Sequence, residues 1–186
     1  MESNIGVMSP LQRRFEKEAA RNVLPNAERF GQLVGIVFIF IFVFYFQSHL
    51  SMGTGFFRSN FGALEAIIFF GIMIFGVLPA ILKFIFGRKN KVRPLEFVNN
   101  VLVVIAGIYF LSTWPFDFSH IADVLPADIQ FIIAWLSDPL MQILMMIGIP
   151  ILSIVSIIEM LTYFGVRRIL EEPGPQPPVE PIQPPQ

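Results

Sequence analysis

Three polar residues at even spacing are the sharpest candidates for chemistry in this sequence. Asp117, His120 and Asp123 lie three residues apart in a segment that joins two apolar runs. If this segment is helical, the spacing places two carboxylates and an imidazole on one face, and zinc or a similar divalent ion accepts such ligands. The sequence therefore predicts a candidate metal site on this loop.

Two further residues could join that cluster. His49 stands at the end of the first long apolar run, and Glu65 stands at the start of the second. A structural interpretation stays open beside the metal site, because Glu65 lies in the first turn of its expected helix, where the helix dipole favours a carboxylate. A bis-histidine haem needs two histidines at matched depth, which these two do not offer, so no cofactor is expected.

Glu159 and Lys83 form a second candidate site. Glu159 is the one acidic residue deep in the last apolar run, and Lys83 closes the second run. An ionisable group inside a membrane span is a functional candidate. If the span ends near Glu159, that residue is interfacial instead, and we expect it to pair with Lys83.

Other catalytic signatures are absent from the sequence. The chain has no cysteine, which excludes disulfides, thiolate nucleophiles and cysteine-ligated metals. It contains no Gly-rich phosphate loop, no GxSxG or HExxH motif and no repeat of 20 to 50 residues. We therefore expect a protein that is not an enzyme.

Composition identifies the class of protein. Of the 186 residues, 54% are hydrophobic and 15% are charged, whereas soluble domains carry about 25% charged residues. The chain has 13 Lys and Arg and 14 Asp and Glu, so it has no excess of basic residues with which to bind nucleic acid. These values indicate an integral membrane protein, with the lipid bilayer as its first partner.

The apolar runs predict an all-α bundle of four transmembrane helices within residues 31–168. The expected spans are residues 31–50, 62–86, 97–115 and 139–166. The first run is too long and starts too late for a cleaved signal peptide. A five-span alternative would split the last run near Gly148 and Pro150. Residues 126–137 are too short to cross, so we expect a short interfacial helix there, with Trp135 at headgroup depth.

The distribution of Lys and Arg predicts the orientation. The N-terminal arm has five, the first loop one, the second connection five, the third loop none and the C-terminal tail two. By the positive-inside rule, both termini are expected to be cytoplasmic, in the cell membrane. His49, Glu65 and the Asp117 to Asp123 segment are then all expected on the outer face.

The segments outside the spans have distinct characters. Ser9 and Pro10 are a helix-start signal, so residues 1–30 are expected to form a cytoplasmic arm with an amphipathic helix at about 10–23. Residues 169–186 are rich in proline, which predicts a disordered cytoplasmic tail.

Glycine and proline inside the spans predict local features. Pro79 and Pro150, which follow Gly76 and Gly148, are expected to kink their helices. Gly31 and Gly35 form a pair on which another helix could pack closely.

These observations favour a non-enzymatic accessory or scaffold subunit of a larger membrane complex, because the spans carry few polar groups. The expected partners are other membrane proteins or further copies of the chain. One alternative is a small oligomeric transporter or channel that uses Glu159. The other is a metal-binding membrane subunit that uses the acidic and histidine residues of the outer loop.

Overall fold

The computed structural model describes residues 10–171, and within them four helices are long and apolar enough to cross a membrane. They are α2 (Asn26–Met52), α3 and α4 together (Ala63–Phe75 and Val77–Phe86), α5 (Lys89–Thr113) and α6 (Asp138–Glu171). This confirms the predicted all-α bundle. The five-span alternative is wrong, because α6 runs without interruption through Gly148 and Pro150.

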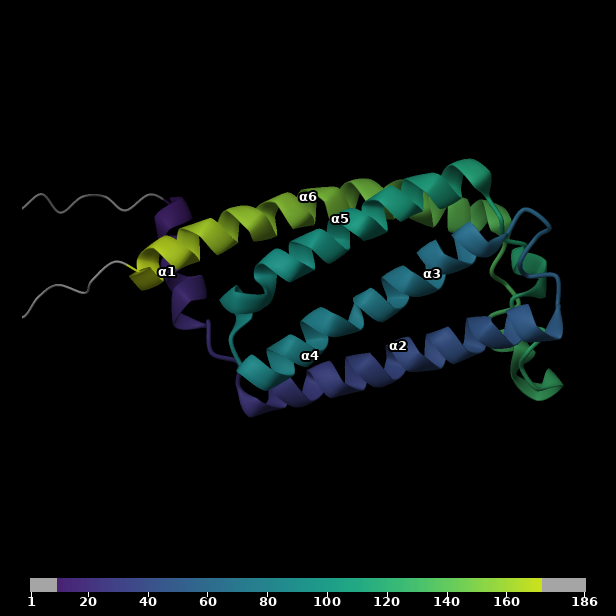
Figure 1. The fold of residues 1–186 in the computed structure, drawn as a ribbon, viewed down its shortest axis with the longest axis horizontal. Helices are drawn as coiled ribbons and strands as arrows, with labels where there is room; N and C mark the ends of the chain where they lie inside the picture. The colour runs from purple at the N-terminus through teal and green to yellow at the C-terminus, as the bar shows by residue number, and fades with distance from the viewer. Residues whose placement is uncertain (1–9, 172–186) are drawn as a thin grey trace, which may run out of the picture.

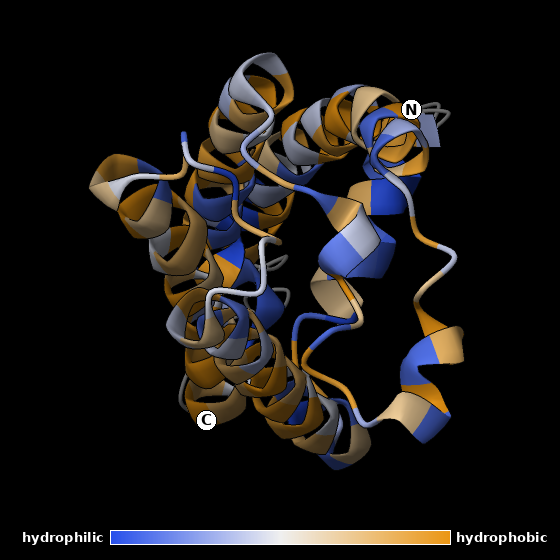
Figure 2. Ribbon diagram, turned by 90° about the vertical axis from the view of Figure 1, so that its right-hand side faces the viewer, coloured by the Kyte–Doolittle hydropathy of each residue, from blue (hydrophilic) through white to orange (hydrophobic). Residues whose placement is uncertain are grey.

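The spanning helices are arranged in chain order (Figure 1). Helix α2 packs on α3 and α4, these two pack on α5, and α5 packs along α6. Both ends of the described chain lie at the same end of the bundle. This end, which includes residues 10–29, 83–93 and 159–171, is called the basic end. The opposite end, with residues 53–62 and 114–137, is called the loop end. Hydrophobic residues predominate along the helices in Figure 2.

The second span is interrupted in its middle. Helix α3 ends at Phe75 and α4 begins at Val77, with Gly76 between them. Pro79 has no amide hydrogen to offer the Phe75 carbonyl four residues earlier, so the helical hydrogen-bond pattern is weakened at this point. Pro150 lies inside the continuous α6, so only one of the two prolines coincides with an interruption.

Helix α6 is longer than a bilayer requires. Its 34 residues span about 51 Å, against about 30 Å for the hydrocarbon core. The stretch from Pro139 to Ile158 carries no charged residue, and Glu159 ends it. The last turns of α6 therefore extend past the apolar part of the bundle at the basic end.

Helix α1 (Pro10–Ala20) packs on this extension of α6 (Figure 1). Phe15 lies against Gly165, where an added Cβ would be 2.5 Å from the phenyl ring. The arm helix expected at about 10–23 thus ends at Ala20. Residues 169–171 belong to α6, and the rest of the predicted Pro-rich tail lies outside the described residues.

Backbone hydrogen bonds fasten the connections at both ends of the bundle. At the basic end, the Leu24 amide donates to the Gly87 carbonyl at 2.8 Å, and the Lys89 amide donates to the Asn22 carbonyl at 2.9 Å. At the loop end, the Asp117 amide donates to the Phe56 carbonyl at 2.7 Å. These hydrogen bonds hold the α1–α2 connection against the α4–α5 connection, and the first loop against the third.

An aromatic cluster fills the loop end. Phe56 is its centre, with 1% of its surface exposed, and its ring lies near the rings of neighbours from α2 and from both loops. Those neighbours are Phe46, His49, Phe57, Phe116 and Phe118. Because these rings come from distant parts of the chain, the cluster holds both loops on the ends of the helices.

The loop end also carries two short 3-10 helices, η1 (Phe118–His120) and η2 (Ala127–Ile132). The second lies within the segment expected to form an interfacial helix. Phe131, Ile132 and Trp135 are all exposed there. Exposed aromatic and aliphatic groups at the end of a membrane bundle suit the headgroup region.

Candidate functional site

His49 is buried at the loop end and both of its ring nitrogens are occupied. Its Nδ1 lies 2.7 Å from the Thr54 hydroxyl, and its Nε2 lies 3.1 Å from the Ile121 carbonyl. A carbonyl only accepts, so Nε2 carries the hydrogen and Nδ1 accepts from Thr54. Tyr45 donates its hydroxyl to the same Ile121 carbonyl. His49 therefore fastens the third loop to α2.

The other candidate metal ligands also have local partners. The Asp117 carboxylate accepts from the Ser119 amide at 3.1 Å and from its hydroxyl at 2.6 Å. These hydrogen bonds favour the ionised form, so the Ser119 hydroxyl lowers the pKa of Asp117 below its usual value. His120 Nδ1 lies 2.8 Å from the Asp123 carboxylate.

Glu65 caps the start of helix α3. Its carboxylate accepts from the Gly62 amide at 2.8 Å, which caps the helix start, and it also accepts from the Tyr109 hydroxyl of α5. Within residues 10–171, no group of three His, Asp or Glu side chains is placed to hold a metal ion. The five residues considered as ligands thus lie at the same end of the bundle but do not converge.

Asp138 is a loop-end residue whose role the sequence did not indicate. Its carboxylate accepts from the Phe118 amide at 2.7 Å and forms an ion pair with Arg58. Asp138 therefore joins the first loop, the third loop and the start of α6. Arg58 and Asp138 are far apart in sequence, so no local pattern could have paired them.

At the basic end, Lys83 pairs with Glu96 of α5 and not with Glu159 as expected. Glu159 instead accepts a hydrogen bond from the side-chain Nδ2 of Asn100 at 3.2 Å. Lys83 and Glu96 end the charge-free parts of α4 and α5, just as Glu159 ends that of α6. Lys83 reaches a partner on α5 and not on α6, because α4 packs on α5 and α5 lies between α4 and α6.

These residues line a charged cavity of about 300 Å³ between α1, α2, α4, α5 and α6. Its acidic residues are Glu18, Glu28, Glu96 and Glu159, and its basic residues are Arg14, Lys83, Lys89 and Arg93. Three ion pairs cross it: Lys83 with Glu96, Lys89 with Glu28 at 2.7 Å, and Arg93 with Glu18 at 2.6 Å. Most of the charge is thus neutralised between helices.

The ion pairs explain how the cavity is assembled. Arg93 of α5 reaches Glu18 of α1, and Lys89 of α5 reaches Glu28 of α2. Arg29 of α2 donates to the Phe84 carbonyl near the end of α4, at 3.0 and 2.6 Å. Such a cation at a helix C-terminus satisfies a carbonyl that lacks a helical partner. The carboxylates and cations that line the cavity can form ion pairs with one another or bind hydrated ions.

The interior closer to the loop end is different. A cavity of about 450 Å³ lies there, and the fourteen residues around it are all aromatic, aliphatic or Met. Phe46, Phe69 and Phe110 are among them, together with Met141 and Met145 of α6. The charged cavity at the basic end is therefore followed by apolar packing toward the loop end.

Comparisons with known proteins found no relative of this chain: no protein-family model, no curated protein and no solved structure matches it.

Proposed function

We propose that the chain is a non-enzymatic integral membrane protein that acts as an accessory or scaffold subunit of a larger membrane complex. One observation carries this proposal: three ion pairs at the basic end join different helices, and the loop end is filled by aromatic rings. Such an interior holds helices together.

The orientation in the membrane is part of the proposal. All Lys and Arg residues except Arg58 belong to the basic end, where both described chain ends also lie. The positive-inside rule places such an end in the cytoplasm. We infer that both termini are cytoplasmic and that the loop end faces outward across the cell membrane.

Helix α2 offers a surface for a partner helix. Gly31 and Gly35 are exposed, and a Cβ added at either would meet open space. Paired small residues let two membrane helices approach closely. Because α2 flanks the bundle (Figure 1), this surface is open to the bilayer.

The test is the composition of the native assembly. We expect the tagged full chain, extracted from its own membranes in mild detergent, to run in intact-complex mass spectrometry as a stoichiometric complex with other membrane proteins. Gly35→Leu is expected to release those partners. Gly148→Leu on α6 is the matched control, because Gly148 also has open space around it. A chain that purifies alone or only as a homo-oligomer would contradict the proposal.

The charged cavity favours one rival, a small transporter or channel. Glu159 lines this cavity and has Asn100 as its hydrogen-bonding partner, which is the kind of site an ion pathway needs. We expect proteoliposomes with the wild-type chain to leak protons no faster than those with Glu159→Gln, measured with an enclosed pH-sensitive dye. Flux that vanishes in Glu159→Gln would favour the transporter.

A further inference from the structure

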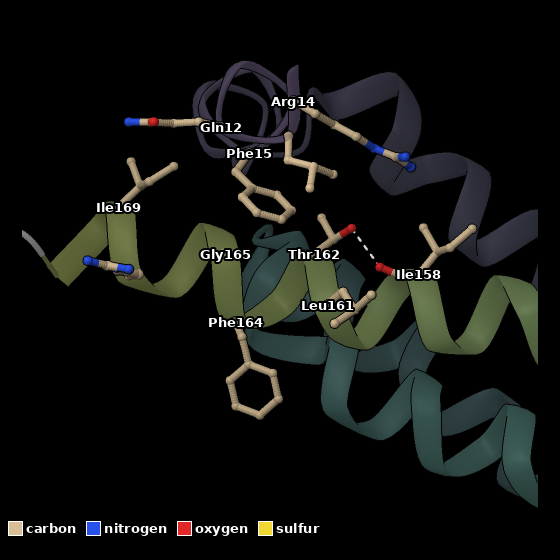
Figure 3. A pocket seen from close by; sticks show the side chains of 11 residues that line it. Gln12, Arg14, Phe15, Ile158, Leu161, Thr162, Phe164, Gly165 and Ile169 are labelled. Carbon is tan, nitrogen blue, oxygen red and sulfur yellow. Dashed lines mark hydrogen bonds between the residues drawn. The ribbon is translucent and has the colours of Figure 1, made fainter. Parts of the chain in front are cut away.

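A groove of about 630 Å³ runs between α1 and α6 at the basic end (Figure 3). Helix α1 is seen nearly end-on above α6 in this view, and Phe15 projects from it toward Gly165. A Cβ at residue 165 would come within 2.5 Å of the Phe15 ring, so this crossing requires glycine. The volume is in the range of small-molecule sites, about 300 to 1,000 Å³.

The groove begins where the apolar part of α6 ends. Its floor includes Ile158, Leu161 and Ile169, and the charge-free stretch of α6 stops at Ile158. Helix α1 crosses α6 there, as an amphipathic helix does when it lies in the plane of a membrane surface. The groove is therefore placed at headgroup depth, with apolar side chains continuing toward the bilayer core.

The charged residues of the described chain that line the groove are basic. They are Arg14 and Arg168, and none of the lining residues within 10–171 is acidic. Within residues 10–171, Arg14 has no hydrogen-bonding or ion-pair partner. Arg13 and Lys17 add positive charge on the same helix, Glu16 offsets one of these charges, and Glu18 is paired with Arg93. Guanidinium groups bind phosphate through charge-assisted hydrogen bonds.

We propose that this groove binds one anionic phospholipid from the leaflet at the basic end. The phosphate binds the Arg14 guanidinium, which lies on the Ile158 side of Phe15 in Figure 3, and the start of an acyl chain follows the apolar floor formed by Ile158 and Leu161. An anionic phospholipid fits both halves of the site, because it joins a phosphate, which a guanidinium binds through charge-assisted hydrogen bonds, to long apolar chains. This site is independent of the proposed role as a subunit.

The experiment compares two neighbouring arginines. The full chain is reconstituted in vesicles of equimolar phosphatidylglycerol and phosphatidylcholine with identical acyl chains, then released in mild detergent for native mass spectrometry. We expect one retained phosphatidylglycerol per chain. Arg14→Gln should lower its occupancy about tenfold. Arg13→Gln, which removes the same charge one residue away from the groove lining, should change it by less than about twofold.

Three results would overturn the proposal. They are equal retention of the two lipids, equal losses in the two variants, and full retention in Arg14→Gln. The first would mean that headgroup charge is not recognised. The second would mean that the basic surface attracts lipid without a site. Both substitutions are at exposed positions of α1, so neither is expected to disturb the bundle.

Discussion

Phe56→Ala is expected to lower the free energy of unfolding by about 3 to 5 kcal/mol, the usual cost of removing a buried phenyl ring. Phe56 has 1% of its surface exposed, and its ring lies 4.9 Å from those of His49 and Phe57. Truncation leaves a cavity between α2 and both loops. The measurement is equilibrium unfolding of the purified chain in mixed micelles.

Phe131→Ala is the matched control for Phe56→Ala. It makes the same chemical change at the same end of the bundle, but the Phe131 side chain is 74% exposed. We expect its cost to be about 0.5 kcal/mol or less. Similar losses in the two variants would mean that the aromatic cluster does not hold the loop end together.

His49→Ala is expected to cost about 3 kcal/mol, from lost ring packing and two lost hydrogen bonds. The ring is 1% exposed and joins Thr54 to the Ile121 carbonyl. His49→Gln keeps an amide donor for that carbonyl, so it should recover about half of the loss. The double variant with Phe56→Ala should cost less than the two single losses together, because the rings touch.

The same variants separate a structural from a metal-binding role for His49. With both ring nitrogens engaged inside the protein, we expect neither EDTA nor added zinc to change the stability of the wild-type chain. A stabilisation by zinc that disappears in His49→Gln would contradict the structural role and return His49, His120 and Asp123 to consideration as ligands.

The spanning helices could be predicted from the sequence because their signal is local. Each apolar run is closed by a charged residue, such as Lys83 or Glu159, and burial of long apolar segments in lipid leaves few alternatives. The helix of the N-terminal arm was also predictable, since the described helix Pro10–Ala20 falls within the expected range of about 10–23.

The pairing of side chains could not be predicted in the same way. Lys83 was expected to pair with Glu159 because both lie at the same depth in the membrane. A shared depth does not determine which helices are neighbours. Glu96 lies on the helix that packs directly against α4, and it takes the pair. Likewise, nothing local to His49 showed that the third loop would fold over it and offer the Ile121 carbonyl.

Proline gave an ambiguous signal. Pro79 coincides with an interrupted span, whereas Pro150 lies in a continuous helix. Gly76 at the junction of α3 and α4 has ordinary right-handed helical dihedrals, φ −60° and ψ −18°, and Gly148 also precedes Pro150, so glycine does not account for the difference. A proline in a membrane span therefore does not by itself predict an interrupted helix.

The membrane topology is the central claim, since it places the basic end in the cytoplasm and the loop end outside. The chain has no cysteine, so a single introduced thiol reports its own location. Ser59→Cys lies at the loop end and Ala20→Cys in α1, and both positions are exposed. In intact cells treated with a membrane-impermeant maleimide, we predict labelling of Ser59→Cys at once and of Ala20→Cys only after permeabilisation. Immediate labelling of Ala20→Cys, with or without Ser59→Cys, would contradict the account.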